Sequence, residues 1–214
     1  MYIPNDFRVT DLEQITSFMQ TNNFATLASR DGERPIASHL LFEVVTGSPS
    51  ECILNCHLAR ANVQWRTFTP ENEVLVIFGD AHTYISPRWY NQAGNVPTWN
   101  YQAVHAYGLP AIVNDQDELF GMLTRLVDRY ESNSGAIPEY HLDAFPKELV
   151  IEKMKGVVGL RIRVTRLEAK FKLSQNRSQA ERENITIELE KRGGENSTMI
   201  ARAMRSPVRR NINC

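Results

Sequence analysis

The chain has 214 residues, of which 42% are hydrophobic and 23% charged, and its formal net charge is -1. This length supports one sizeable core, and the near-neutral charge excludes the strongly basic surface of a dedicated nucleic-acid-binding protein. No apolar run approaches the ~20 residues that span a bilayer, and the N-terminal segment lacks the charged and apolar regions of a signal peptide. We therefore expect a cytoplasmic protein without membrane contact.

The first half of the chain indicates one helix followed by strands. The spacing of apolar residues predicts an amphipathic helix over residues 11–20, with Thr10 as N-cap and Glu13 completing a capping box. β-Branched and alternating patterns predict strands at residues 24–29, 35–45, 52–57, 73–79 and 81–86, the first two joined by a turn at Asp31 and Gly32. Residues 58–66 contain no glycine or proline, and we expect a short helix there.

The second half combines long strands with helices. A strand is expected over residues 100–113, with a bend or bulge at Gly108 and Pro110. Amphipathic spacing predicts a helix over residues 115–130, capped by Asn114 or Asp115, and a shorter helix over residues 146–154. The remaining elements are a strand from residue 157 that alternates apolar and basic residues and a helix over residues 178–191.

The C-terminal segment is basic and has no strong core pattern. After Gly193 and Gly194 it carries four arginines against one acid, namely Arg202, Arg205, Arg209 and Arg210. We expect an unstructured or crossing-over tail, although such tails also bind nucleic acid. The chain is accordingly divided into one domain, residues 1–194, and a basic tail, residues 195–214.

The order of the elements favours one class of fold. Antiparallel strands with short turns, and helices inserted late, indicate a closed or split β-barrel of mainly β structure with α additions. The βαβα alternation of a doubly wound sheet is missing, and neither glycine-rich phosphate-loop motif occurs. We expect an antiparallel split barrel.

The cysteines indicate neither a disulfide nor a metal centre. Cys52 and Cys56 lie four residues apart in a predicted strand, which separates their Cα atoms by about 13 Å. The limit for a disulfide is roughly 7 Å. His57 is adjacent, but a second cluster of ligands is missing, so no metal is expected.

Residues 170–177 carry the most specific chemistry, because they gather cations, amides, a hydroxyl and an aromatic ring at one strand end. Alone, such a segment also fits a plain polar strand end. Together with residues 1–7, 57–66 and 84–101, it resembles the signature stretches of the PaiB-type FMN-binding negative transcriptional regulators. That family is a branch of the FMN-binding split-barrel superfamily, which includes the pyridoxamine-phosphate oxidases, and the resemblance covers residues 1–190.

The resemblance implies a split-barrel homodimer with FMN in clefts between subunits. In it Arg60 and Asn62 are expected at the opening of a helix, where free N–H groups favour the phosphate. Ser38 and His39 are candidates for ring or ribityl contacts, although Pro35 and His39 depart from the oxidase pattern. The remaining expected contacts are His57, Trp99 and Asn100, together with Lys172, Ser174, Gln175 and Asn176 from the other subunit.

Three functions remain open at this point. The family resemblance implies an FMN-loaded regulator that represses transcription, directly or through a partner. For DNA contact the basic tail is the only electrostatic feature, because no helix-turn-helix pattern is present. An FMN-dependent oxidoreductase of a small molecule is the second reading, and haem binding on the same scaffold is the third.

Overall fold

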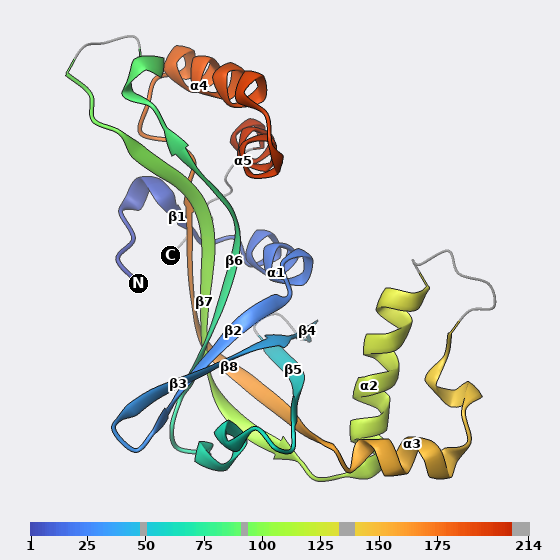
Figure 1. Cartoon of the computed structure of the whole chain (residues 1–214). Helices are drawn as coiled ribbons and strands as arrows, with labels where there is room; N and C mark the ends of the chain where they lie inside the picture. Colours follow the sequence, from blue (N-terminus) through green and yellow to red (C-terminus); the bar gives the residue numbers. More distant parts are fainter. Residues whose placement is uncertain (48–50, 91–93, 133–139, 207–214) are drawn as a thin grey trace. The chain divides into compact units, whose positions relative to one another are not determined.

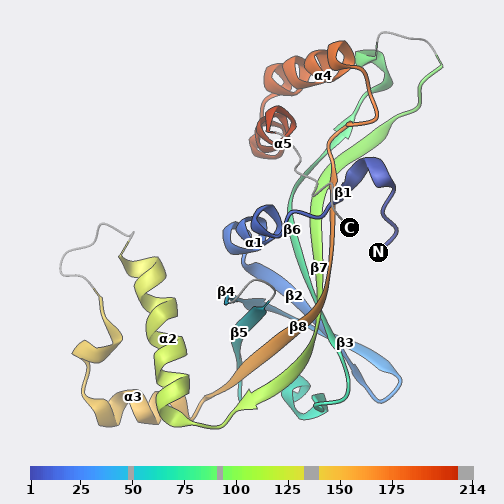
Figure 2. The ribbon, with the colours of Figure 1, turned by 180° about the vertical axis from the view of Figure 1, so that it is seen from behind.

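The computed structural model describes residues 1–47, 51–90, 94–132 and 140–206. The chain forms two compact units (Figure 1; Figure 2). The first unit comprises Met1–Asn22, Ile77–His105 and Leu167–Cys214, and the second comprises Asn23–Val76 and Ala106–Arg166. Each unit is described below by itself.

The described residues contain eight strands and five α-helices. The strands are β1 (Arg8–Val9), β2 (Phe24–Asp31), β3 (Arg34–Leu41), β4 (Glu43–Thr46), β5 (Cys52–Ala59), β6 (Val74–Ile85), β7 (Thr98–Val113) and β8 (Val157–Lys172). The α-helices are α1 (Leu12–Thr21), α2 (Gln116–Glu131), α3 (Lys147–Met154), α4 (Gln179–Arg192) and α5 (Glu195–Arg205), and four short 3-10 helices are η1 (Asn5–Phe7), η2 (Val63–Thr67), η3 (Pro87–Trp89) and η4 (Leu142–Ala144). Hydrogen bonding orders the strands β3-β2-β6-β7-β8-β5-β4, and β1 pairs with β8. This mainly antiparallel architecture is consistent with the expected split barrel, while the dimer stays a prediction.

A tight hairpin opens the second unit. β2 and β3 pair from Phe24 with Leu41 to Asp31 with Arg34, which leaves two residues in the turn. Gly32, the first of these, has a φ of +60°, whereas Glu33 is not in the left-handed region. A positive φ at the first central position alone is typical of a type II′ turn, which matches the twist of the strands it joins.

The strand predicted over residues 35–45 is wrong, because the structure divides it at Phe42. β3 pairs with β2, whereas β4 pairs with β5. Phe42 is fully buried. Its N–H donates to Asn23 O at 2.8 Å, and Asn23 Nδ2 donates to Phe42 O at 3.1 Å. These two bonds turn the chain out of one strand pair and into the next.

One predicted break in a long strand is also absent. Residues 73–79 and 81–86 were expected as separate strands, but β6 runs continuously from Val74 to Ile85. β7 contains Gly108 and Pro110 within one strand, as expected, and the bend or bulge at these residues stays a prediction. Gly108 has another role, because a Cβ there would lie 2.6 Å from Arg163 O. The glycine therefore permits a close approach to the backbone of β8.

The helix ends follow local capping chemistry. The N-cap of α1 is Asp11, whose Oδ1 accepts from Gln14 N at 2.8 Å, and not Thr10 as predicted. Asp115 caps α2, which is one of the two predicted residues. Ser178 and Glu181 form a capping box at α4. Each cap satisfies an N–H group that the first turn leaves without an intrahelical partner.

The segment expected as an unstructured tail contains a helix in the first unit. α5 follows Gly193 and Gly194, which have φ values of +69° and +79°. Ile200 and Met204 are buried on one face of the helix, and α4 and α5 lie side by side in both views (Figure 1; Figure 2). Arg209 and Arg210 lie outside the described residues, and the domain boundary at residue 194 stays a prediction.

In the second unit, α2 and α3 have a small core of their own. Its buried members are Val113, Leu119, Met122, Val150 and Met154. Phe120, Leu123, Leu142 and Val157 are partly buried and pack against it. The insertion of these helices between β7 and β8 therefore brings its own apolar contacts.

Cys52 and Cys56 are free and buried in the second unit. Burial raises the pKa of the Cys52 thiol to about 11 and that of the Cys56 thiol further. The described helices include none that is long and apolar enough to cross a membrane.

Candidate functional site

In the second unit, the predicted site residues meet where β3 lies against the segment after β5. Asn62 Nδ2 donates to Ser38 Oγ at 2.8 Å, and Asn62 Oδ1 accepts from Gln64 N at 3.0 Å. Asn62 thereby caps η2 and ties it to β3. Two segments that the resemblance placed in one site are therefore adjacent in the structure.

The helix predicted over residues 58–66 is wrong in its extent. β5 continues to Ala59, which pairs with Val157 of β8, and only Val63–Thr67 form the 3-10 helix η2. Pairing with β8 keeps the chain extended where local spacing alone indicated a helix. The side chain of Asn62 already accepts from Gln64 N, so we do not assign anion binding to the opening of this short helix.

Hydrogen bonds of its backbone N–H, its backbone carbonyl and its guanidinium hold Arg60 in place. Its Nε donates to Lys155 O at 2.7 Å, and its Nη2 donates to Val157 O at 2.8 Å. Its backbone N–H donates to Gly156 O at 2.8 Å, and Trp65 Nε1 donates to Arg60 O at 3.0 Å. A guanidinium has five N–H groups, so this exposed side chain retains donors for a further acceptor.

Gln64 supports this corner, and it belongs to a signature stretch of the family resemblance although it is not one of the predicted site residues. Gln64 is 0% exposed. Its Nε2 donates to Leu27 O at 3.1 Å and to Ser29 Oγ at 3.0 Å, which attaches η2 to β2. Its Oε1 is buried and has no hydrogen-bond partner in the described part of the chain.

The two predicted histidines of this unit do not join Ser38 and Asn62. His39 is exposed, and its Nδ1 lies 3.0 Å from Thr26 Oγ1. Successive side chains of a strand point to opposite faces, so His39 and Ser38 diverge. His57 lines a cavity of only about 10 Å³ beside Met122 of α2. Burial lowers the pKa of His57, which favours the neutral imidazole.

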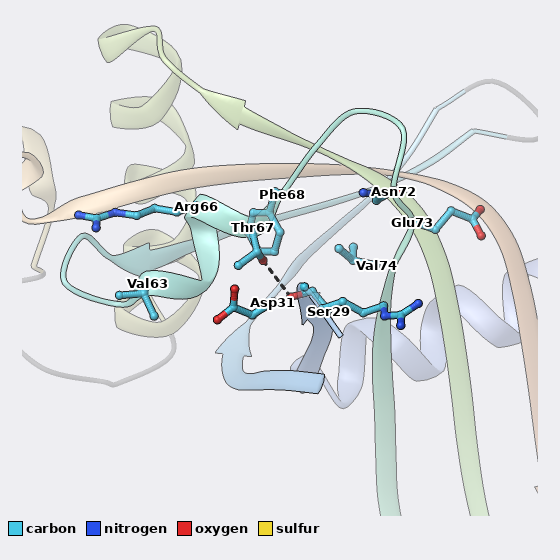
Figure 3. Close-up of a pocket in the computed structure, with 11 residues that line it drawn as sticks. Ser29, Asp31, Val63, Arg66, Thr67, Phe68, Asn72, Glu73 and Val74 are labelled. Carbon is cyan, nitrogen blue, oxygen red and sulfur yellow. Dashed lines mark hydrogen bonds between the residues drawn. The ribbon is translucent and has the colours of Figure 1, made fainter. Parts of the chain in front are cut away.

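A larger cavity opens between the β2–β3 turn, η2 and the start of β6 (Figure 3). Its volume is about 740 Å³, which lies within the range of ligand pockets. Figure 3 shows the hydrogen bond between Ser29 and Thr67, and the side chain of Arg66 extends away from this bond. The two hydroxyl oxygens are 3.4 Å apart. Charged side chains of both signs line the cavity, and its lining residues are Ser29, Arg30, Asp31, Gly32, Val63, Arg66, Thr67, Phe68, Asn72, Glu73 and Val74. None of the predicted site residues is among them.

In the first unit, Asn100 and Ser174 form a buried polar pair. Asn100 is 0% exposed, and its Nδ2 donates to Ser174 Oγ at 3.0 Å and lies 3.5 Å from Met204 Sδ. Ser174 has a φ of 61°, which residues with a side chain rarely adopt. The pair holds the turn after β8 against β7 and α5. Met204 belongs to the segment that was expected to lack structure.

Lys172 and its neighbour Lys170 carry the positive charge of this unit's predicted site. Lys172 Nζ donates to Thr98 Oγ1, and burial lowers the pKa of Lys172, with a further contribution from Lys170. Lys170 was not predicted as a site residue. It is 9% exposed, and its Nζ donates to Tyr2 O at 3.2 Å and lies 5.2 Å from the centroid of the Tyr101 ring.

The other predicted residues of the first unit differ in how far they are engaged. Gln175 closes its own turn, because its Oε1 accepts from Leu173 N at 2.7 Å and its Nε2 donates to Phe171 O. Asn176 is exposed. Trp99 is 50% exposed, and its ring lies 5.4 Å from that of His82. Gln175 is therefore a structural residue of the turn, whereas Asn176 and Trp99 are accessible.

The described residues include no group of three or more histidine, cysteine, aspartate or glutamate side chains placed to hold a metal ion. The donors around Asn62 in the second unit are hydroxyl, amide and guanidinium groups. The N–H and O–H groups of such side chains bind oxyanions such as phosphate.

Comparison with protein families confirms the resemblance seen in the sequence. Residues 1–166 match the family model described as "Putative FMN-binding domain". The Bacillus subtilis protein named "Protease synthase and sporulation protein PAI 2" is 37% identical over 212 residues, which cover 99% of this chain and 100% of that protein.

Solved structures share the fold at low sequence identity. The FAD and haem binding protein of Mycobacterium smegmatis has a TM-score of 0.58 and 15% identity, over 77% of this chain and 73% of that chain. The flavocytochrome Anf3 of Azotobacter vinelandii has a TM-score of 0.56 and 12% identity, over 75% of this chain and 67% of that chain. These similarities support the fold class that the sequence predicts.

Proposed function

Because this chain belongs to the FMN-binding domain family, we propose that it binds FMN and that Ser38, Arg60 and Asn62 hold the phosphate of the cofactor. FMN combines a dianionic phosphate, a polyol chain and a flat polarised ring. The phosphate needs a cation with several N–H or O–H donors around it. The corner between β3 and η2 offers this combination.

The three side chains retain donors that fit a phosphate. Ser38 Oγ accepts from Asn62, so its own proton is available to an oxyanion. The amide of Asn62 has a second N–H group, and Arg60 uses its Nε and Nη2 on backbone carbonyls, which leaves Nη1. Within the described chain, none of the three forms a hydrogen bond or ion pair with a carboxylate that would compete with the phosphate.

One observation carries the proposal, namely the hydrogen bond of 2.8 Å between Asn62 Nδ2 and Ser38 Oγ. It joins residues that are 24 positions apart in the sequence. The sequence resemblance independently assigns both residues to the cofactor. Backbone contacts at residues 155–157 fix the neighbouring Arg60, so the donors are preorganised.

Bound FMN supplies a ring that accepts one or two electrons. The role of the chain at this corner is to bind and orient. We further propose that the FMN-loaded protein acts in the cytoplasm as a homodimeric negative regulator of transcription. The name of the Bacillus subtilis relative associates that protein with protease synthesis and sporulation, and this association supports regulation rather than metabolism.

The test is a titration of the purified protein with FMN, in which flavin absorption and fluorescence report binding. We expect saturable binding, and replacing Arg60 or Asn62 by alanine should raise the Kd for FMN. Each loses a charge-assisted hydrogen bond of about 1.5–3 kcal/mol, which corresponds to roughly 10-fold to 150-fold. Arg66→Ala is the matched control, because it removes an exposed cation from the adjoining helix. Circular dichroism confirms that each variant folds.

The same preparation separates the alternatives. Absence of FMN binding by the native protein, or equal losses in the Arg66→Ala control, would refute the site. Bleaching of the flavin by NAD(P)H, with turnover of an acceptor, would instead favour an oxidoreductase. A Soret band after haemin titration would favour haem. The regulator predicts a dimer mass in solution and a mobility shift of promoter DNA that depends on FMN.

A further inference from the structure

A second cavity, lined by none of the residues proposed for the phosphate, lies between α2, η4 and α3 of the second unit. Its volume is about 440 Å³. The lining residues are Gln116, Asp117, Phe120, Leu142, Asp143, Phe145, Lys147, Val150, Ile151 and Met154. An apolar wall with a few polar groups at the rim, at this volume, is typical of a small-molecule site.

The walls of this cavity are supported from behind. Val150 and Met154 belong both to the lining and to the small core of the two helices. On the outer side, Phe145 is 37% exposed and Leu149 is 45% exposed. A supported apolar hollow next to exposed large apolar side chains is typical of a surface that binds a ligand.

The charges at the rim select among ligands. Asp117 and Asp143 contribute two negative charges and Lys147 one positive charge, so the rim has an excess of one negative charge. None of these three side chains forms a hydrogen bond or ion pair with another residue in the described part of the chain. These charges are therefore available to a ligand, and they favour a cation over an anion.

We propose that this cavity binds a small molecule with an apolar body and one amino group, and that the bound molecule alters the affinity of the protein for FMN. The second part rests on the proposed function. Binding to the cavity does not depend on it. The apolar body fills the space beside Phe120 and Leu142, and the amino group lies at the acidic rim.

A short path connects the cavity with the corner proposed for the phosphate. Ile151 and Met154 line the cavity, and α3 ends at Met154. Lys155 N donates to Ile151 O at 3.3 Å, and Lys155 O accepts from Arg60 Nε at 2.7 Å. A ligand that shifts the last turn of α3 therefore shifts an acceptor that orients Arg60. By thermodynamic linkage, FMN must change the affinity for the ligand by the same factor.

Binding is tested with the neutral dye N-phenyl-1-naphthylamine, whose fluorescence rises in apolar sites. We expect the dye to bind the full chain, and 1-naphthylmethylamine to displace it at a concentration at least about 3-fold lower than 1-naphthylacetate. Leu142→Trp fills the cavity and should abolish dye binding, whereas Ile187→Ala, which removes an exposed apolar side chain from α4, should leave it unchanged. Phe145→Ala removes a wall and should weaken binding if Leu142→Trp does not fold.

The charge preference has its own control. The double change Asp117→Asn and Asp143→Asn should remove the advantage of the amine over the carboxylate. Glu148→Gln, on α3 but outside the lining, should preserve it. Failure of the native protein to bind the dye, or equal binding by Leu142→Trp, would overturn the proposed site.

Coupling is measured by titrating FMN with and without saturating 1-naphthylmethylamine. We expect the Kd for FMN to change at least about 3-fold, and Leu142→Trp to abolish the change. An unchanged Kd would overturn the coupling. If FMN does not bind in either case, the proposed function fails, whereas the dye titration still decides whether the cavity is a site.

Discussion

Gly108→Ala tests whether glycine is required where β7 approaches β8 in the second unit. A Cβ at this position would lie 2.6 Å from Arg163 O and 2.6 Å from Ile162 Cγ2. Real Cβ atoms essentially never approach other heavy atoms closer than 3.0 Å. The carbonyl belongs to the backbone of β8, so relief requires movement of the strand rather than rotation of a side chain.

The magnitude follows from two opposing effects. Overpacking of this kind costs about 1–3 kcal/mol. Loss of glycine freedom in the unfolded chain offsets about 0.4–1 kcal/mol of that cost. We therefore expect Gly108→Ala to lower the free energy of unfolding by about 1–2 kcal/mol. With an m-value of about 3 kcal/mol/M, the urea midpoint should fall by about 0.5 M.

The assay is urea unfolding, monitored by tryptophan fluorescence. Gly79→Ala is the matched control, because a Cβ at Gly79 in β6 meets no atom within 4 Å and the φ there is not positive. This control should leave the protein unchanged or stabilise it by up to about 1 kcal/mol. A midpoint for Gly108→Ala equal to that of Gly79→Ala would refute the reasoning.

Three further measurements address other parts of the chain. Ser174→Ala leaves the fully buried Asn100 without its hydroxyl partner and should cost about 1–3 kcal/mol in urea unfolding; a loss below ~0.3 kcal/mol would contradict a structural pair. Ile200→Ala, at 0% exposure in α5, should cost about 2–5 kcal/mol, and a neutral result would mean that α5 does not pack. Burial lowers the pKa of His57 below 6.5, so the unfolded chain binds more protons and stability should fall as pH drops below 6.5. His57→Gln should reduce this pH dependence in thermal unfolding, and an unchanged profile would exclude His57 as its source.

Elements with local signals could be predicted from the sequence. The helix predicted over residues 178–191 begins within one residue of α4, whose capping box of Ser178 and Glu181 is a local signal. Asp115 is one of the two caps predicted for α2. The division of β3 from β4 could not be predicted. It is set by hydrogen bonds between Phe42 and Asn23, and no glycine or proline marks the position.

The candidate site shows the same limit. The sequence assigned Ser38 and Asn62 to one site, and the structure places them in contact. The carbonyls that hold Arg60 lie about 95 residues away, and no local pattern indicates them. In α5, by contrast, a signal was present: Ser197, Ile200, Ala201 and Met204 are all buried, and they recur at helical spacing. The prediction that this segment has no strong core pattern is therefore wrong for α5.

β3 is an edge strand of the sheet, and Pro35 lies near the beginning of this strand. The closing pair of the hairpin is Asp31 with Arg34, so the next pair, Arg30 with Pro35, does not exchange backbone hydrogen bonds. The nitrogen of Pro35 therefore faces away from β2, and it has no proton to donate to an incoming strand. A second chain that paired along this edge would find one donor missing, so Pro35 makes extension of the sheet at this position less favourable.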